Sequence, residues 1–409
     1  MKNEASVPAN MSGVKNQASL TKALPVLFGF FIMGFVDVVG IATNYVKRDF
    51  ALSDTLANLL PMMVFAWFAV FSVPTGLLMN RIGRKRTVEL SLAITLLAML
   101  IPLVSYTFPV ILVAFALLGI GNTILQVSLN PLLTNVVRGD RLTSSLTWGQ
   151  FIKAIASFSG PIISGFAAGS LGNWKLIFPI FGAATLISGL WLVVTRIKEE
   201  PMQGKTSSFG ACFGLLKNNT ILLLFLAILF VVGVDVGLNT TIPRFLMGRC
   251  GIPLEKAGLG TSLYFMARTT GSFAGALLLM KISGRKFFIV SMLAGIGGMV
   301  AMLLMSNLWA ILAMIFVLGL AVANVFSIVF SAAIQQIPER ANEISGLMIM
   351  GVAGGAVFPV IMGVVSDSVG QAGGLLVLLG ALVYLLFCAF RMKAARDDRG
   401  SRAASSAGD

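Results

Sequence analysis

The chain has 409 residues, of which 57% are hydrophobic and only 11% are charged, and its formal net charge is +14. Soluble domains carry about 25% charged residues, so this composition indicates a polytopic membrane protein. There is no histidine, and the three cysteines are scattered along the chain. This pattern excludes a disulfide framework and the usual zinc chemistry, and we expect neither a metal nor a cofactor.

Twelve stretches are apolar and long enough to cross a bilayer, which takes about 20 residues of helix. The longest polar interruption follows the sixth stretch, so we predict an all-α protein of two six-helix bundles, residues 24–197 and 218–392. Residues 198–217 are the predicted cytoplasmic linker, and residues 1–23 and 393–409 are predicted cytoplasmic tails. The predicted spans are 24–46, 54–79, 88–105, 109–137, 142–169, 175–196, 218–246, 255–280, 287–306, 308–336, 342–368 and 373–392.

Positive side chains are distributed unequally between the two sides of the predicted membrane. With both termini inside, the inner segments hold 22 of the 30 Lys and Arg residues. Loops rich in Lys and Arg stay cytoplasmic, so we predict this orientation, and the positive charge needs no nucleic-acid partner. The residues assigned to outer loops are Lys47, Arg48, Lys175, Arg244, Arg249 and Lys256.

The two halves of the chain resemble each other. "GFVDVVG" at 34–40 corresponds to "VGVDVGL" at 232–238, and "NRIGRKR" at 80–86 corresponds to "KISGRK" at 281–286. Two parallel repeats of six helices are typical of a transporter architecture that binds its substrate between the halves, near the middle of the membrane.

Polar side chains occur in only some of the spans. A charge at mid-membrane is costly, so it normally faces a partner or a water-filled cavity. The third, sixth, ninth and twelfth spans are apolar at their centres and are predicted to face lipid, whereas the others surround a polar cavity. The intramembrane charges are Asp37, Lys153, Asp235 and Arg268.

The stretch "GLLMNRIGRKR" after the second span resembles the loop signature of the major facilitator superfamily, G-x3-D-R-x-G-R-[RK]. Asn80 stands where the signature has aspartate. The resemblance covers nearly the whole chain and implies the major facilitator fold, with cytoplasmic gating loops after the second and eighth spans. The gating residues that it implies are Gly76, Arg81, Gly83, Arg84, Lys85, Gly284 and Arg285.

Three further stretches resemble the fucose permease branch of sugar–proton symporters: "GFVDVVG", "LQVSLNPLLTNV" and "WGQFIKAIASFSGP". This branch usually has an acidic residue at the position of Gln126 and an asparagine at the position of Lys153. The resemblance implies a sugar symporter. The loss of a carboxylate and the gain of an ammonium imply changed coupling and a changed substrate preference.

The four intramembrane charges sum to zero and permit two interpretations. They form two buried ion pairs that only hold helices together, or one aspartate is protonated during transport and leaves a net charge of +1 for an anionic substrate. If Lys153 and Arg268 form no ion pair, an anionic substrate is favoured. If each forms an ion pair with an aspartate, a neutral substrate is favoured. The candidate coupling residues are Asp37, Asp235 and Asn44, and the candidate substrate-binding residues are Lys153, Arg268, Gln126, Asn130, Gln150, Asn239 and Asn324.

We therefore expect a monomeric importer in the bacterial inner membrane that carries a monosaccharide with H⁺ by alternating access. An acidic sugar, such as sialic acid or a uronate, is the expected substrate. The alternatives are a neutral hexose or deoxyhexose symporter driven by H⁺ or Na⁺, and a drug or metabolite exporter. An enzyme or receptor is not expected, because the sequence has neither a catalytic constellation nor an extramembrane domain.

Overall fold

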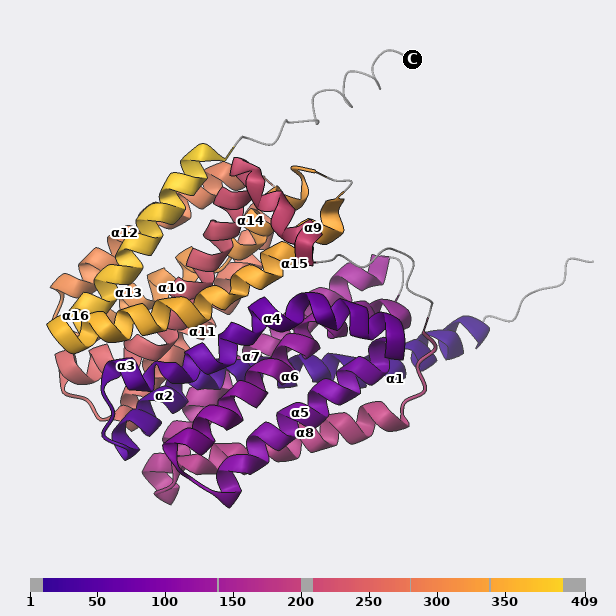
Figure 1. Cartoon of the computed structure of the whole chain (residues 1–409), viewed down its shortest axis with the longest axis horizontal. Helices are drawn as coiled ribbons and strands as arrows, with labels where there is room; N and C mark the ends of the chain where they lie inside the picture. The colour runs from indigo at the N-terminus through magenta and orange to yellow at the C-terminus, as the bar shows by residue number, and fades with distance from the viewer. Residues whose placement is uncertain (1–9, 138–139, 200–208, 280, 338–339, 393–409) are drawn as a thin grey trace, which may run out of the picture.

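The computed structural model describes residues 10–137, 140–199, 209–279, 281–337 and 340–392. Every regular element in these ranges is a helix (Figure 1). Inside a bilayer each backbone N–H and C=O group must be satisfied by the protein, and a long helix does this without a partner segment.

The helices follow the chain in two groups, before and after the predicted linker. The first group comprises α1 (Asn10–Met33), η1 (Gly34–Asp37), α2 (Val38–Asp49), α3 (Asp54–Ala57), α4 (Leu59–Ile82), α5 (Arg84–Val104), α6 (Phe108–Val136), α7 (Asp140–Leu171), η2 (Trp174–Leu176) and α8 (Ile177–Val194). The second group comprises α9 (Phe209–Gly214), η3 (Leu215–Lys217), α10 (Asn219–Cys250), α11 (Leu254–Leu279), α12 (Gly284–Leu304), α13 (Leu308–Val322), α14 (Val325–Ile334), α15 (Ala341–Met350), η5 (Gly351–Ala353) and α16 (Gly354–Arg391).

Ten helical stretches in the described residues are long and apolar enough to cross a membrane. The last of them, Glu343–Arg391, contains Gly370 with a φ of +80°, a left-handed conformation that interrupts the helix between the two final predicted spans. Helix α11 corresponds to the predicted span 255–280 and is not among the ten. Its Thr, Ser and Arg side chains make it less apolar, as expected of a helix beside a polar cavity.

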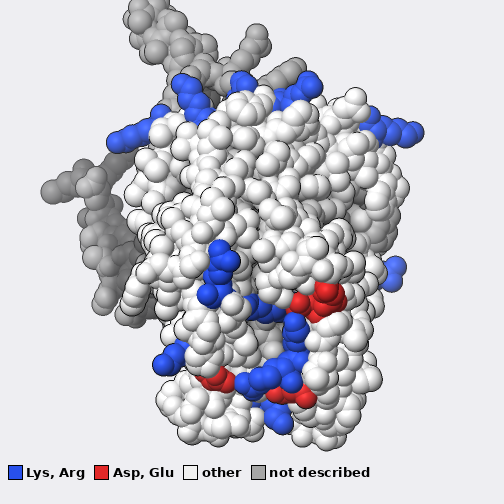
Figure 2. Space-filling model, turned by 90° about the vertical axis from the view of Figure 1, so that its left-hand side faces the viewer, with Lys and Arg blue, Asp and Glu red and all other residues white. Residues whose placement is uncertain are grey.

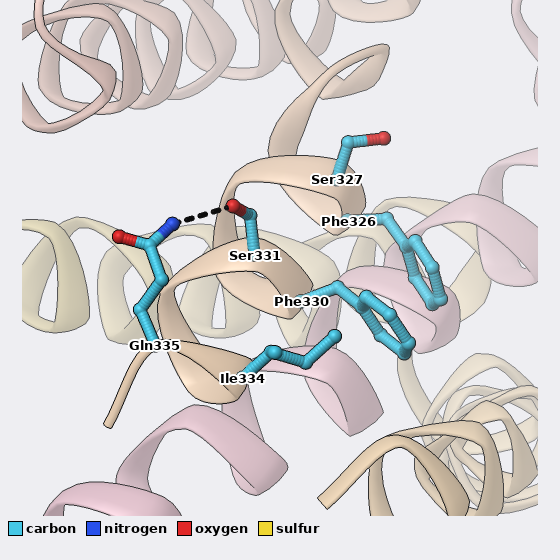
Figure 3. A pocket seen from close by; sticks show the side chains of 6 residues that line it. All are labelled: Phe326, Ser327, Phe330, Ser331, Ile334 and Gln335. Atoms are coloured by element: carbon cyan, nitrogen blue, oxygen red, sulfur yellow. Dashed lines mark hydrogen bonds between the residues drawn. The ribbon is translucent and has the colours of Figure 1, made fainter. Parts of the chain in front are cut away.

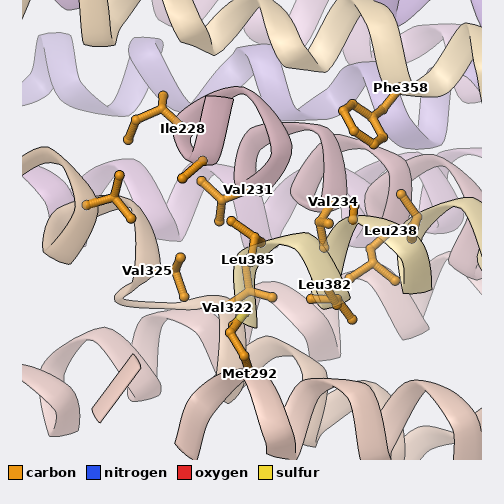
Figure 4. Close-up of a cluster of buried hydrophobic side chains, with 14 of the residues drawn as sticks. Ile228, Val231, Val234, Leu238, Met292, Val322, Val325, Phe358, Leu382 and Leu385 are labelled. Atoms are coloured by element: carbon orange, nitrogen blue, oxygen red, sulfur yellow. The ribbon is translucent and has the colours of Figure 1, made fainter. Parts of the chain in front are cut away.

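Buried apolar side chains form two clusters. One consists mainly of residues between 23 and 192, and the other mainly of residues between 215 and 389. Figure 4 shows part of the second cluster, where Leu382 and Leu385 of α16 lie beside α10. Phe326 contacts both clusters, so it lies at the boundary between the two halves of the molecule.

Several helices carry large apolar side chains on the outside of the molecule. Leu97 of α5, Leu190 of α8, Val290 of α12 and Val383 of α16 are all more than half exposed. These helices correspond to the third, sixth, ninth and twelfth predicted spans, so their exposure agrees with a lipid-facing position. Figure 2 shows a broad belt with almost no charged side chains between two charged regions.

Candidate functional site

Asp37 lies where the first long helix is interrupted. The 3-10 turn η1 joins α1 to α2 and ends at Asp37. Gly34 in this turn packs against α7, because a Cβ there would lie 2.7 Å from the Cβ of Ala156. The close approach brings the hydroxyl of Ser157 to 2.5 Å from Asp37 Oδ2. The other carboxylate oxygen of Asp37 has no hydrogen-bond partner among the described residues.

Lys153 lies on α7 one turn before Ser157 and is half-buried. Its ammonium and the carboxylate of Asp37 interact electrostatically. No carboxylate of the described residues lies within 4 Å of its Nζ atom, which is the limit for an ion pair. Lys153 is therefore near an acid without being bound to it.

Asp235 and Arg268 form the corresponding pair in the second half of the chain, and their side chains are in direct contact as an ion pair. Arg268 Nη1 of α11 donates to Asp235 Oδ2 of α10 at 2.6 Å. The hydroxyl of Tyr264, one turn before Arg268, donates to Asp235 Oδ1 at 2.7 Å. Both carboxylate oxygens of Asp235 are thus occupied, which fixes the position of the guanidinium.

The two pairs belong to one site at the boundary between the halves. Asp37 interacts electrostatically with Asp235 and Arg268 as well as with Lys153. The Nδ2 atom of Asn239 on α10 donates to the backbone oxygen of Asp37 at 2.9 Å, which joins the first half to the second. We call Asp37, Lys153, Asp235 and Arg268 the four-charge site.

The predicted amides fall into two groups. Asn239 and Asn324 are buried and bind helix backbones, and Asn324 Nδ2 donates to the carbonyl oxygen of Gly271 at 2.7 Å. Gln126 is half-buried and donates to Asn122 Oδ1 at 2.7 Å. Asn130 and Gln150 are exposed. The structure therefore places Asn239 and Asn324 at helix contacts and leaves Gln126, Asn130 and Gln150 more accessible.

Arg244 connects the halves at the end of the molecule where α2 and α3 meet. Sequence analysis counted it with the outer-loop residues although it falls at the end of the predicted span 218–246; it lies within α10 and is only 7% exposed. Its guanidinium donates to Asn44 at 2.7 Å, to Asp54 at 2.8 Å and to Asn58 at 3.1 Å. These partners in the first half explain how the charge is buried, and they place Asn44 among them rather than beside Asp37.

Asp54 and its neighbours form further contacts across this end, which we call the Asp54 face. Asp367 of α16 accepts hydrogen bonds from the backbone N–H groups of Asp54, at 2.7 Å, and Thr55, at 2.9 Å. Arg48 forms an ion pair with Glu255 at 2.9 Å. Figure 2 shows positive and negative side chains gathered at this face. Contacts between the halves thus close the molecule here.

Tyr106 and Trp174 hold Asp49 at the same face. The Tyr106 hydroxyl donates to Asp49 Oδ2 at 2.7 Å, and the indole N–H of Trp174 donates to the same oxygen at 2.8 Å. Burial, followed by the hydrogen bond to Asp49, raises the pKa of Tyr106 above that of an ordinary tyrosine, which favours the protonated hydroxyl as the donor to Asp49. Aromatic residues of this kind are typical of a membrane–water interface.

The signature loop lies at the opposite end, which we call the Arg84 face. Gly83 has a φ of +89°, which only glycine adopts without strain, and α5 begins at the next residue. The carboxylate of Glu199 accepts hydrogen bonds from the backbone N–H groups of Arg84, at 2.6 Å, and Lys85, at 2.9 Å. Glu199, from the predicted linker, therefore supplies a carboxylate beside the loop in which Asn80 replaces the usual acid.

The other predicted gating residues also lie at or near the Arg84 face. The guanidinium of Arg84 donates to the carbonyl oxygen of Pro131 at 3.2 Å and to Asn135. Gly284 begins α12, and Arg285 donates to the carbonyl oxygen of Phe390 at 2.9 Å. Gly76 and Arg81 lie within α4, and Arg81 is exposed.

A pocket of about 330 Å³ lies along α14 (Figure 3). Its polar lining consists of Ser327, Ser331 and Gln335, and the adjacent apolar lining consists of Phe326, Phe330 and Ile334. All three polar residues are exposed.

Sequence reasoning missed the hydrogen bonds of Ser157 and Tyr264 to the two aspartates, and the contacts of Arg244 and Glu199. Ser157 lies one turn from Lys153 and Tyr264 one turn from Arg268. A polar residue one helical turn from an intramembrane charge is therefore a signal that could have found both. The contacts of Arg244 and Glu199 join segments far apart in the chain and left no such local signal.

Long apolar helices around a charged site between two halves define a multi-pass membrane transporter. The chain belongs to the Major Facilitator Superfamily, whose sequence profile matches residues 26–260. This membership confirms the predicted family, the all-helical membrane fold and the expectation of a transporter rather than an enzyme.

Two curated relatives match over most of their length. A glucose/galactose transporter of Brucella abortus is 24% identical over 416 residues, which cover 93% of this chain and 97% of that protein. A hexuronate transporter of Bacillus subtilis is 22% identical over 394 residues, which cover 88% and 92%.

Two solved structures share the fold. A bacterial homologue of the human lysosomal transporter Spinster, inward-facing and occupied, has a TM-score of 0.71 at 19% identity and covers 95% of this chain and 98% of its own. The E. coli fucose:proton symporter has a TM-score of 0.66 at 16% identity and covers 92% of this chain and 100% of its own.

Proposed function

We propose that the protein is a secondary active importer that carries a monosaccharide together with H⁺, and that it prefers an acidic sugar such as sialic acid or a uronate. The observation that carries this proposal is the unequal pairing of the two cations. Arg268 is bound to Asp235, whereas Lys153 has no ion-pair partner within 4 Å among the described residues. A half-buried ammonium without a fixed counter-ion suits the carboxylate of a substrate.

Asp37 is the proposed coupling residue because one of its carboxylate oxygens accepts no hydrogen bond from the part of the chain that the structure describes. When Asp37 binds a proton, the four-charge site carries a net charge of +1 and attracts a monoanion. When Asp37 releases the proton, its carboxylate competes with the substrate for Lys153. Proton binding and anion binding therefore favour each other, which is the thermodynamic requirement of symport.

The remaining candidates have narrower roles in this proposal. Asp235, with both oxygens occupied by Tyr264 and Arg268, is proposed to hold the guanidinium in place. Asn44 is poorly placed to be a Na⁺ ligand, because its side-chain oxygen already accepts a hydrogen bond from Arg244. The positive charge of Arg244 also repels a cation. Coupling to H⁺ is thereby favoured over coupling to Na⁺.

A neutral hexose is the second candidate substrate. The relative from Brucella abortus is named a glucose/galactose transporter, and it matches nearly the whole chain. The accessible amides Gln126, Asn130 and Gln150 both donate and accept hydrogen bonds, as sugar hydroxyls require. The hexuronate transporter of Bacillus subtilis is the corresponding support for an acidic sugar.

We further propose that the Arg84 face is cytoplasmic and the Asp54 face is external, in a bacterial inner membrane. This orientation puts both termini and the linker 198–217 in the cytoplasm. The protein then works as a monomer with twelve spans, in two bundles of residues 24–197 and 218–392. Transport follows by rocking of the two bundles around the four-charge site, and the closed Asp54 face corresponds to a state shut toward the outside.

Arg244→Gln tests the role of the Asp54 face. Removing one partner of a buried ion pair costs about 3–5 kcal/mol, so we expect this variant to open more often toward the outside. A cysteine at Ile41, which packs against Gly258 across the closed face, reports opening by its reaction with a membrane-impermeant thiol reagent. We expect labelling from outside to become at least about tenfold faster.

The matched control is Arg249→Gln on the same helix. Arg249 is exposed, and its partners among the described residues are the carbonyl oxygens of Leu303 and Met305, within the second half. Its replacement is expected to leave the labelling rate unchanged. Equal labelling rates for Arg244→Gln and the parent protein would contradict the assignment of this face as a closed outer gate.

Uptake into proteoliposomes tests the proposed function. The purified protein is given labelled glucuronate, N-acetylneuraminate, galactose or fucose under an inward H⁺ gradient, an inward Na⁺ gradient or no gradient. We expect an acidic sugar to accumulate above equilibrium only with the H⁺ gradient. Accumulation of galactose or fucose alone would support the neutral-hexose alternative, and accumulation with Na⁺ alone would contradict H⁺ coupling.

A further inference from the structure

The pocket along α14 is separate from the four-charge site. Ser327, Ser331 and Gln335 follow one another at intervals of four residues, so they lie along one side of the helix (Figure 3). Phe326 and Phe330 form an adjacent stripe, and their rings are stacked with centroids 5.7 Å apart. The pocket therefore combines hydroxyl and amide groups with two aromatic rings.

The composition of this stripe indicates that it faces water rather than lipid. Helices α5, α8 and α12 expose leucine, valine and isoleucine, whereas the exposed residues of the pocket are two serines of α14 and the glutamine that follows this helix. Phe326 contacts the hydrophobic clusters of both halves, so the pocket opens at the boundary between the halves.

The position of the pocket follows from Asn324, which directly precedes α14 and binds the backbone of Gly271. Gly271 lies about one turn beyond Arg268 along α11. From Asn324 the helix α14 continues toward the start of α12 at the Arg84 face, where a Cβ on Gly284 would lie 3.6 Å from Ile328. The pocket thus lies between that site and the Arg84 face, on the path that a substrate takes into the cytoplasm in the proposed orientation.

We propose that this pocket is an exit subsite, which binds the sugar ring after it leaves the four-charge site. The inference rests on the proposed sugar transport and adds a second binding position to it. Aromatic rings offer an apolar surface to the C–H face of a pyranose, and hydroxyl and amide groups bind its hydroxyls. The described residues that line the pocket are all uncharged, so we expect it to bind neutral and acidic sugars alike.

Two polar groups in the pocket are oriented for such a ligand. Gln335 Nε2 donates to Ser331 Oγ at 2.9 Å, which leaves the Ser331 hydroxyl proton available as a donor. The side-chain oxygen of Gln335 points away from Ser331 and is available as an acceptor (Figure 3). The pair thus offers one donor and one acceptor to adjacent hydroxyls of a sugar.

The test is the double variant Ser331→Ala/Gln335→Ala, assayed for sugar transport in both directions across vesicles of known orientation. We expect the KM for sugar on the cytoplasmic side to rise about tenfold, because each lost hydrogen bond weakens binding several-fold. The KM for sugar on the external side is expected to stay the same, because the four-charge site is unchanged.

The matched control is Gln336→Ala, which removes the exposed amide next to the pocket. Gln336 binds only the carbonyl oxygen of Ala332 among the described residues and does not line the pocket, so both KM values are expected to be unchanged. An unchanged cytoplasmic KM in the double variant, or an equal rise on both sides, would overturn the exit subsite. Absence of any sugar transport by the parent protein would instead overturn the proposed function on which it rests.

Discussion

An Asp37→Asn carrier is expected to lose gradient-driven accumulation of its sugar while it still exchanges labelled for unlabelled sugar across the membrane. The amide keeps the size of the carboxyl group and its contact with Ser157, but it cannot bind or release a proton. With one proton per sugar, one pH unit sustains about tenfold accumulation, and this ratio should fall to equilibrium in the variant. The measurement is the steady-state ratio of internal to external sugar in proteoliposomes.

Asp235→Asn is the matched control for this variant, because Asp235 occupies the corresponding position of the internal repeat. Its replacement leaves the guanidinium of Arg268 without its counter-ion. The side chains of Arg268 and Asp235 are only partly buried, at 30% and 19% exposed, and loss of the partner is still expected to lower the melting temperature. If Asp37→Asn still accumulates sugar as the parent protein does, Asp37 is not the coupling residue.

Lys153→Gln is expected to discriminate between sugars by their charge. A hydrogen bond to a charged group contributes about 1.5–3 kcal/mol, so the variant should bind glucuronate about 10- to 100-fold more weakly. Galactose, which has no carboxylate, should be affected much less. The measurement is the KM for uptake of the two sugars by the variant and by the parent protein.

Lys153→Arg serves as the control because it keeps the positive charge at this position. It should retain most of the preference for the acidic sugar, although the guanidinium has a different shape and hydration. An equal loss of glucuronate and galactose uptake in Lys153→Gln would contradict a contact between Lys153 and a carboxylate. It would indicate instead that Lys153 only supports the structure around Asp37.

The four-charge site could be predicted largely from the sequence, because a charged residue in an apolar span is conspicuous and costly. The structure brings Asp37, Lys153, Asp235 and Arg268 close enough to interact electrostatically, and their role in transport stays a prediction. The pairing within it could not be predicted, because it depends on distances between helices far apart in the chain. Only the structure shows that Arg268 is bound to Asp235 and that Lys153 has no carboxylate within 4 Å among the described residues.

The contacts at the two ends of the molecule could be predicted less well from the sequence than the charged residues at its centre. Arg244 lies near the end of a span, where hydropathy does not distinguish a buried arginine from one in a loop. Its partners Asn44, Asp54 and Asn58 are about 190 residues away in the chain, and only the fold brings them together. The contact of Glu199 with the start of α5 could not be predicted either, because no sequence pattern links a carboxylate in a polar linker to the start of a distant helix.

The central claim is that one site binds an anionic sugar and a proton together, with Lys153 and Asp37 as the respective groups. The most direct test is the number of protons taken up when glucuronate binds to the purified protein, measured calorimetrically in buffers of different ionisation enthalpy. We predict uptake of up to about one proton per sugar by the parent protein near neutral pH, and none by Asp37→Asn. Binding of glucuronate without proton uptake by the parent protein, or with the same uptake by Asp37→Asn, would contradict it.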